Sequence, residues 1–218
     1  MTLNTTSQCC KQEEPHFLQK HSCLFDIGRV LLDFDFESSL TKLIPINIEN
    51  PQERIRKVLK KKDALEIGLI DPKSFAEWAL KTLASDASAE QFYHAWRQIF
   101  TVNEPMWQCV HKLARNNYSL ILLSNISAIH CPWIFTAYPE FSCFDHKALS
   151  FEIGALKPEL EIYQYAINTY RLNPALTIYI DDQPQNITAG KTLGFQCWQY
   201  DLNDHHAFEV WLEEHLLT

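Results

Sequence analysis

The sequence lacks several features that would place it in whole classes of protein. No apolar stretch approaches the roughly 18 residues that a membrane-spanning helix needs. The first residues have neither the basic start nor the apolar middle of a signal peptide. Internal repeats and low-complexity tracts are also missing. These absences favour an ordinary globular protein that is not held in a membrane, and we expect it in the cytoplasm.

Positive charge is in short supply as well. The formal net charge is −8, with 19 lysines and arginines against 27 acidic residues. This argues against nucleic acid or an anionic membrane as partner, because both need a basic surface. The one basic run, residues 54–62, is expected to be a solvated helix face. A small anionic substrate is not excluded, since a metal ion or a few local cations can hold one phosphate.

Cysteine pairs at the usual ligand spacing are missing too. The seven cysteines are odd in number and include no CxxC pair. Three of them lie in apolar runs, where a free thiol behaves as a small hydrophobe: Cys23, Cys143 and Cys197. We therefore expect reduced cysteines rather than a disulfide framework or a zinc site. Cys9 and Cys10 belong to a polar segment, residues 1–20, that is expected to be a flexible tail.

What is present is an alternation of strand-like and helical patterns. Strand-like runs occupy residues 22–25, 118–123, 148–151, 175–180 and 195–200, and helical patterns separate the later ones. This order predicts an α/β fold with a Rossmann-like parallel sheet. A wholly helical stretch, residues 50–100, follows a short helix at 36–44 and precedes the second strand. It is expected to form a small helical cap above the carboxyl edge of the sheet, where it could act as a lid.

The expected domains follow from this pattern. The core takes residues 21–36 and 103–218, and the helical cap takes residues 37–102. Four aromatic residues of the cap recur at helical spacing and are expected to form its core rather than a substrate wall: Phe75, Trp78, Phe92 and Trp96.

Polar residues follow the apolar runs at four places. Asp26 ends the first strand-like run, Ser124-Asn125 the second, and Asp181-Asp182 a later one, while Lys157 precedes the helix-starting Pro158. Taken singly, each could be a turn or helix-capping residue. The aspartate pair is the strongest of the four, because adjacent carboxylates at a strand end repel each other unless a cation sits there. Mg²⁺ takes one or two protein carboxylates and reaches for substrate phosphate.

The four clusters occur in an order that resembles the haloacid dehalogenase-like hydrolase superfamily. The matching segments are Phe25-Asp26-Ile27-Gly28-Arg29-Val30-Leu31-Leu32-Asp33-Phe34-Asp35, Leu122-Leu123-Ser124-Asn125, Leu156-Lys157-Pro158-Glu159 and Ile180-Asp181-Asp182-Gln183-Pro184-Gln185-Asn186. The first segment is similar to phosphatases of the glucose-1-phosphatase kind, and the last to the phosphatase domain of soluble epoxide hydrolases.

The resemblance implies a Mg²⁺-dependent phosphatase and a role for each residue. Asp26 would attack phosphorus and form an aspartyl-phosphate, and Mg²⁺ would be held by Asp26, the Gly28 carbonyl and Asp182. Ser124 and the backbone N–H of Asn125 would hold a phosphate oxygen, and Lys157 would pair with the nucleophile and the phosphate. Asp181 would orient either the Lys157 ammonium or a metal-bound water. The substrate would be a small phosphorylated metabolite, such as a sugar 1-phosphate.

One position departs from the pattern of most phosphatases in the superfamily. Gly28 stands where they carry a second aspartate as general acid and base. That help is typically worth about 10²–10⁴-fold in rate, or roughly 3–5 kcal/mol of barrier. Either the leaving group is good, as an anomeric sugar oxygen would be, or activity is weak. Arg29 also replaces a more usual glycine or asparagine.

Two other functions stay open at this stage. A 2-haloacid dehalogenase would use Asp26 to attack carbon; that branch also lacks the second aspartate but needs no metal, whereas the Asp181-Asp182 pair favours one. A binding or regulatory protein that lost turnover is supported by Gly28 alone, and the retained Asp26 and Lys157 argue against it. Sensitivity to chelators separates a phosphatase from a dehalogenase.

Overall fold

The structure, a computed structural model, describes residues 21–216. The expected tail at 1–20, with Cys9 and Cys10, lies outside the described residues. Five cysteines fall within them, and all five are free thiols, as expected: Cys23, Cys109, Cys131, Cys143 and Cys197. No helix in the described part of the chain is long and apolar enough to cross a membrane.

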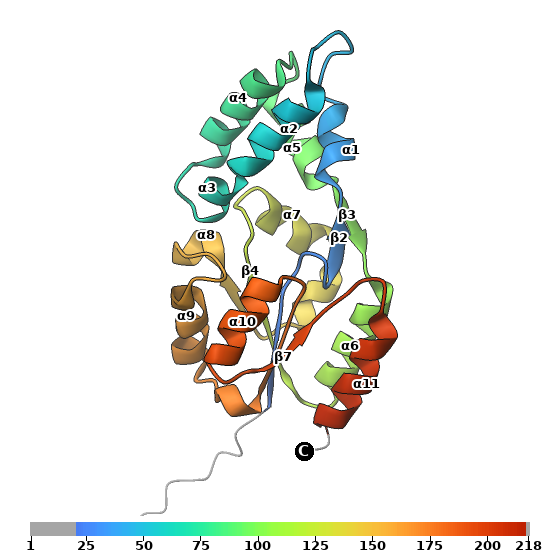
Figure 1. The fold of residues 1–218 in the computed structure, drawn as a ribbon, viewed down its shortest axis with the longest axis vertical. Helices are drawn as coiled ribbons and strands as arrows, with labels where there is room; N and C mark the ends of the chain where they lie inside the picture. Colours follow the sequence, from blue (N-terminus) through green and yellow to red (C-terminus); the bar gives the residue numbers. More distant parts are fainter. Residues whose placement is uncertain (1–20, 217–218) are drawn as a thin grey trace, which may run out of the picture.

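Five parallel strands form the central sheet, in the order β5-β4-β1-β6-β7 (Figure 1). Their bounds are Ser22–Phe25 for β1, Ser119–Ser124 for β4, His146–Leu149 for β5, Thr177–Asp181 for β6 and Gln196–Gln199 for β7. The middle strand is β1, where Phe25 pairs with Leu122 of β4 on one side and with Ile180 of β6 on the other. The predicted α/β fold with a Rossmann-like parallel sheet is confirmed.

Helices cover both faces of this sheet. One face packs against α6 (Glu104–Arg115), α7 (His130–Ala137) and α11 (His205–Leu216), and the other against α9 (Leu160–Tyr170) and α10 (Pro184–Thr192). Side chains of β1 alternate between the two sides: Cys23 and Phe25 join the first cluster, and Leu24 the second. A parallel sheet buried on both faces explains why its strands are apolar runs rather than alternating ones. Short elements complete this part: η1 (Pro139–Cys143), α8 (Ser150–Ile153) and η2 (Pro174–Leu176).

Five helices form a separate block above the carboxyl edge of the sheet (Figure 1). This helical block consists of α1 (Phe36–Thr41), α2 (Pro51–Lys60), α3 (Lys62–Glu66), α4 (Pro72–Leu83) and α5 (Ala89–Arg97). Asp71 accepts a bond from Ser74 N at the start of α4, and Ser88 forms a capping box with Gln91 at the start of α5, so local sequence sets where both begin. The exact domain division at residues 37–102 stays a proposal.

The four aromatic side chains expected in the core of this block lie there. Phe75, Phe92 and Trp96 are completely buried, and Trp78 is partly buried against the same cluster. The Trp78 ring also lies 4.2 Å from the Lys61 ammonium, measured to the ring centroid. These rings hold the helices of the block together, as predicted from their helical spacing.

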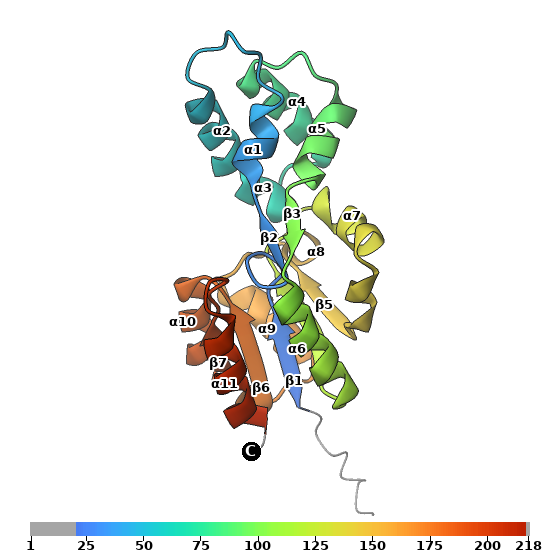
Figure 2. The ribbon, with the colours of Figure 1, turned by 90° about the vertical axis from the view of Figure 1, so that its right-hand side faces the viewer.

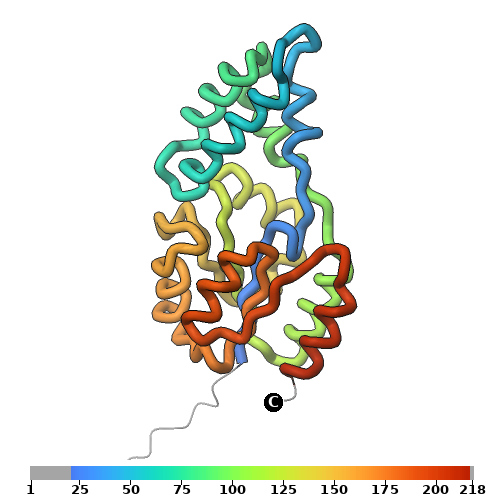
Figure 3. Tube along the Cα trace, in the orientation of Figure 1, coloured from blue at the N-terminus to red at the C-terminus, as the bar shows by residue number. Residues whose placement is uncertain are grey.

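A two-stranded antiparallel ribbon joins the block to the sheet (Figure 2). It pairs β2 (Leu32–Phe34) with β3 (Phe100–Val102), with Phe34 opposite Phe100. The prediction that the helical pattern runs on to Phe100 is therefore wrong at its end. Three residues of strand are too short to show a period, and the partner strand lies far away in sequence. The chain enters and leaves the block side by side through this ribbon (Figure 3).

Candidate active site at the carboxyl edge of the sheet

Asp26 follows the middle strand, and three donors converge on one of its oxygens. Its Oδ1 accepts bonds from the Ile27 backbone N–H at 2.7 Å and from Ser124 Oγ at 2.7 Å, and it lies 3.0 Å from Lys157 Nζ. Ser124 can reach Asp26 because β4 and β1 are neighbours and both end at this edge. The carboxylate is thereby held in one orientation, and its Oδ2 receives none of these three bonds.

Asp181 ends β6, the other neighbour of β1, and its carboxylate is surrounded by donors. Oδ2 accepts from Lys157 Nζ at 2.6 Å and from Tyr179 Oη at 2.7 Å. Oδ1 accepts from Gln183 N and from Asn186 Nδ2, both at 2.9 Å. With four donors in place, Asp181 is an acceptor that fixes the ammonium of Lys157, which is the contact predicted for it.

Asn125 acts on the backbone of Lys157. Its Nδ2 donates to the Lys157 carbonyl at 3.0 Å, and its Oδ1 accepts from the Lys157 N–H at 2.8 Å. This two-bond clamp holds the start of the loop before α9, whose Lys157-Pro158 peptide bond is cis. The side chain of Asn125 is thus occupied in placing the lysine, and its backbone N–H is the group predicted to hold a phosphate oxygen.

The charges of the site do not balance within the protein. Asp26, Asp181 and Asp182 bring carboxylate oxygens within 4.8 Å of one another, and the one ammonium among them belongs to Lys157. Burial raises the pKa of Asp26 despite Lys157, and burial together with the other two carboxylates raises the pKa of Asp182 to about 6. The two carboxylates raise the pKa of Lys157 in spite of its burial, so it stays protonated. Two buried carboxylates and a partly buried one, with a single cation among them, suit a divalent metal ion.

The donor pattern separates the possible ligands of such an ion. Asp181 already accepts four bonds, whereas Asp182 is bonded by the Gln183 side chain at 2.5 Å and lines the same pocket as Asp26. Gly28 also lines this pocket. Asp26, Gly28 and Asp182 stay the predicted ligand set, and oxygen ligands of this kind suit Mg²⁺.

The structure gives a physical reason for the unusual residues at positions 28 and 29. A Cβ atom on Gly28 would lie 2.9 Å from Cε1 of Phe34, so the ring fills the space where a larger residue would begin. Arg29 has φ of +58°, the left-handed region that glycine and asparagine enter more easily. Its guanidinium stacks on Phe34 at 4.6 Å, donates to the Phe34 carbonyl at 3.0 Å and pairs with Asp33. Sequence reasoning missed Phe34, although residues 32, 34 and 36 alternate as in a strand.

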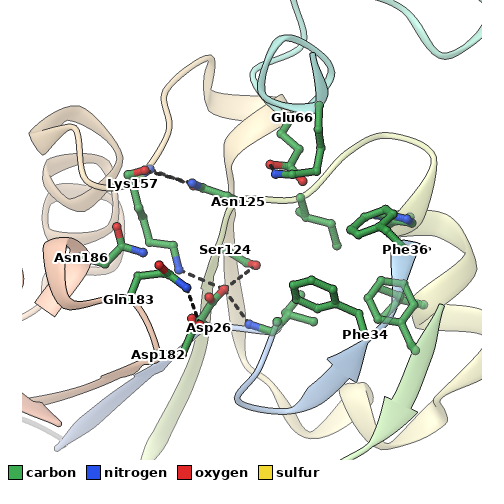
Figure 4. A pocket seen from close by; sticks show the side chains of 17 residues that line it. Asp26, Phe34, Phe36, Glu66, Ser124, Asn125, Lys157, Asp182, Gln183 and Asn186 are labelled. Carbon is green, nitrogen blue, oxygen red and sulfur yellow. Dashed lines mark hydrogen bonds and ion pairs between the residues drawn. The ribbon is translucent and has the colours of Figure 1, made fainter. Parts of the chain in front are cut away.

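Two charged residues of the helical block, Lys62 and Glu66, line the pocket, and Figure 4 shows Glu66 at its upper side. Lys62 Nζ lies 2.5 Å from Glu66 Oε2, and the Glu66 side chain is 7% exposed. Burial raises the pKa of Glu66 to about 7, although Lys62 opposes this shift. The expected solvated face at 54–62 is therefore wrong at its last residue, because Lys62 turns toward the pocket. The i, i+4 spacing of this pair was the available signal.

One hydroxyl joins the block to the loops of the sheet edge. Ser150 Oγ donates to the Glu66 carbonyl at 2.6 Å and accepts from the Ile126 N–H at 3.0 Å. Glu66 therefore stands at a fixed place above the loop that carries Ser124 and Asn125. The pocket is open on one side and has a volume of about 210 Å³, below the roughly 300–1,000 Å³ of pockets for drug-sized ligands.

Comparison with known proteins agrees with this geometry. A family model described as haloacid dehalogenase-like hydrolase matches residues 21–194. A curated relative from Bacteroides thetaiotaomicron, D-ribitol-5-phosphate phosphatase, is 27% identical over 188 residues, which cover 81% of this chain and 89% of the relative.

Solved structures show the same fold. An enzyme of this family from Bacteroides thetaiotaomicron, solved with magnesium and inorganic phosphate, has a TM-score of 0.72 and 26% identity over 84% of this chain and 95% of its own. L-2-haloacid dehalogenase from Xanthobacter autotrophicus has a TM-score of 0.60 and 16% identity over 82% of this chain and 76% of its own, which shows the fold alone. The predicted superfamily with its phosphatase branch, and the predicted cofactor Mg²⁺, are confirmed.

Proposed function

We infer, from the premise that the chain belongs to the haloacid dehalogenase-like hydrolase family, that it is a Mg²⁺-dependent phosphatase of small sugar or sugar-alcohol phosphates. The observation that carries this proposal is the trio of carboxylates at Asp26, Asp181 and Asp182 around a single ammonium. A dehalogenase, which needs no metal, has no use for three carboxylates so close together. The cytoplasm remains the proposed location.

The residues present support one division of labour in the reaction. Asp26 is the nucleophile, and the three donors on its Oδ1 keep the carboxylate facing the pocket. Mg²⁺ would be held by Asp26, the Gly28 carbonyl and Asp182, and would supply neutralising charge for the phosphoryl group. Attack of Asp26 on phosphorus forms an aspartyl-phosphate and breaks the bond to the leaving oxygen, which departs as an alkoxide and takes its proton from solvent water. A second water then cleaves the phosphoaspartate, which restores Asp26 and releases inorganic phosphate.

Positioned cations and donors stabilise the charge on the phosphoryl group. Lys157 is held by Asp181 at 2.6 Å and clamped through its backbone by Asn125, so its ammonium is preorganised. Ser124 Oγ and the Asn125 N–H lie at the end of β4 and would hold a phosphate oxygen. Lys157 and the Asn125 backbone are fixed before substrate binds, so they cost little reorganisation during the reaction. The Ser124 hydroxyl donates to Asp26 Oδ1 at 2.7 Å and would turn from that oxygen to the phosphate.

The upper half of the pocket supports a polyol substrate. With phosphate at Asp26, the carbon chain would extend past the rings of Phe34 and Phe100, which line the pocket, toward the Lys62–Glu66 pair. An ammonium and a carboxylate offer both a donor and an acceptor to hydroxyl groups. We therefore propose Lys62 and Glu66 as the residues that recognise substrate hydroxyls, and the small cavity favours a substrate of the size of a pentose or hexose phosphate.

Gly28 affects which phosphate esters the enzyme can hydrolyse, because it offers no acid to the leaving oxygen. Without a side-chain acid at this position, an anomeric oxygen departs more easily than a primary alkoxide. The curated relative is named for D-ribitol 5-phosphate, whose leaving group is a primary alcohol. Comparing glucose 1-phosphate with ribitol 5-phosphate therefore separates two effects. Preference for the sugar 1-phosphate would follow from the leaving group and Gly28, and preference for ribitol 5-phosphate from contacts between the substrate hydroxyls and the helical block.

A phosphate-release assay tests the proposal. Purified protein is given glucose 1-phosphate, ribitol 5-phosphate, acetyl phosphate or 2-chloropropionate, each with Mg²⁺ and with a chelator. We expect Mg²⁺-dependent release of phosphate from at least one ester and no halide. Halide release in the chelator would instead support a dehalogenase, and no turnover of any compound would support a binding protein.

A further inference from the structure

A second cluster of metal-ligating side chains lies away from the pocket, in the seam between α6 and α11. Cys109 on α6 brings its Sγ to 3.6 Å from Nε2 of His205, the first residue of α11. One helical turn later, Glu209 brings its Oε1 to 3.8 Å from the same Nε2. The three ligand atoms lie within 4.8 Å of one another. This cluster shares no residue with the pocket that contains Asp26.

These separations fit a tetrahedral zinc ion. With Zn–S at about 2.3 Å and Zn–N at about 2.0–2.1 Å, the tetrahedral angle puts sulfur and nitrogen about 3.6 Å apart. The observed distance between Cys109 Sγ and His205 Nε2 is 3.6 Å. The same construction puts nitrogen and a carboxylate oxygen at about 3.3–3.5 Å, and the half-exposed Glu209 side chain can rotate to close the remaining gap.

The imidazole of His205 is oriented as a metal ligand would be. Its Nδ1 lies 2.9 Å from the hydroxyl of Tyr200, and that hydroxyl oxygen also accepts from Asn103 Nδ2 at 2.9 Å. When Nδ1–H donates to Tyr200, Nε2 presents its lone pair to Cys109 and Glu209. Ligating histidines generally have their second nitrogen held in this way, which fixes both tautomer and ring plane.

The surroundings leave room for a fourth ligand. A cavity of about 180 Å³ is lined by Cys109 and Glu209, and it leaves space for water beside two of the three ligands. The nearby Lys112 ammonium lies 3.3 Å from Glu213 Oε1, so it has a carboxylate partner of its own. Thiolate and imidazole ligands favour zinc over magnesium, which prefers oxygen ligands.

We propose that Cys109, His205 and Glu209 bind a zinc ion, with water in the fourth position. The ion fastens α11 to α6 on one face of the sheet. Its ligand His205 is hydrogen-bonded to Tyr200, and the Tyr200 hydroxyl accepts a bond from Asn103. The Asn103 side chain also donates to the Val30 carbonyl at 2.6 Å, close to the start of the ribbon that leads to the helical block. Sequence spacing gave no sign of this site, because 96 residues separate the cysteine from the histidine.

Cobalt substitution tests the proposal on the full chain. The protein is treated with a chelator, given excess Mg²⁺ to occupy the carboxylate site, and titrated with Co²⁺. We expect one equivalent to give intense visible bands of tetrahedral Co²⁺ and a thiolate-to-cobalt charge-transfer band in the near ultraviolet. Zn²⁺ should then displace the Co²⁺ and remove both. A titration without the charge-transfer band overturns the proposal.

Variants identify the cysteine that binds the metal and test the contact between His205 Nδ1 and Tyr200. Cys109→Ala should lose the charge-transfer band, whereas Cys143→Ala and Cys9→Ser/Cys10→Ser should keep it. Tyr200→Phe retains all three ligands and should keep the band while weakening Zn²⁺ affinity by about 10–100-fold. A band that persists in Cys109→Ala, or disappears with Cys9 and Cys10, places the metal elsewhere. Unchanged affinity in Tyr200→Phe contradicts the assigned orientation of His205. None of these readouts depends on phosphatase activity, so they stand apart from the proposed function.

Discussion

The two sides of the pocket are built on different principles. The lower side, at the edge of the sheet, is dense in charge, and nearly every polar atom there has a partner: Asp181 alone accepts four bonds. The upper side, in the helical block, rests on a cluster of aromatic and aliphatic side chains and presents one charged pair, Lys62 and Glu66. Only the lower side resembles a preorganised catalytic site.

The difference indicates that the sheet edge carries out the chemical step and that the helical block contributes to substrate recognition. Groups at the sheet edge are fixed by strand ends and by each other, so a change there should act on the rate of the chemical step. Glu66 is held to the core by one hydroxyl, Ser150, and by packing within its own block. A change there should act on substrate binding and on the stability of the block.

The largest expected effect is at Asp26. Asp26→Asn keeps the shape of the side chain but removes the nucleophile, and the expected loss of turnover is at least about 10⁴-fold. Asp145→Asn is the matched control, because Asp145 accepts bonds from Ser119 and Leu120 at the opposite edge of the same sheet. Steady-state phosphate release measures both variants. Turnover by Asp26→Asn at the wild-type rate would refute covalent catalysis by this residue.

The sequence predicted the lower side better than the upper side. Asp26, Ser124 and Asp181 each follow an apolar strand, and parallel strands end at one edge, so their meeting follows once β4, β1 and β6 are neighbours. The strand order itself does not follow from the local pattern and was supplied by the structure. The clamp between Asn125 and Lys157 joins two loops that no periodicity connects.

The sequence pattern did not predict contacts between short segments that lie far apart in the chain. Phe34 reaches Gly28 because a three-residue strand pairs with residues 100–102, and the alternation at residues 32, 34 and 36 indicates a strand without indicating this distant partner. Glu66 looked like one charge among many, and its burial depends on how α3 docks onto Ser150. Both are tertiary effects that override local pattern, and both lie on the side of the pocket expected to meet the substrate.

The second prediction concerns the charge of Glu66 on the upper side. Its pKa is raised from 4.5 to about 7, so between these values the folded protein holds a proton that the unfolded chain releases. Folding stability should therefore fall as pH rises from 4.5 to 7 and stay constant above. The burial penalty amounts to at most about 3 kcal/mol.

Glu66→Gln removes this titration and tests it. The melting temperature of the variant minus that of wild type should increase from pH 4.5 to pH 7 and then level off. The ion pair with Lys62 forms only as Glu66 ionises, and its contribution is already contained in the pKa of about 7, so its loss adds no separate trend. Glu77→Gln on the exposed side of α4 is the control and should show no such trend. A flat difference for Glu66→Gln would mean that the carboxylate is ionised in the fold at little cost.

The smallest expected effect is at the junction of the two sides, where Phe34 lies against Gly28. Gly28→Asp restores the side chain that most phosphatases of the family carry, but its Cβ would stand 2.9 Å from the Phe34 ring. The crowding should cost about 1–3 kcal/mol of stability. Phe34→Leu makes room, so the double variant should be more stable than the sum of the two single effects, by about 1 kcal/mol or more. Chemical denaturation of all four proteins measures this coupling, and strictly additive changes would show that the ring does not exclude a side chain at position 28.

If the coupling is found, the double variant should also gain turnover of ribitol 5-phosphate relative to glucose 1-phosphate, because a new carboxylic acid helps the poorer leaving group more.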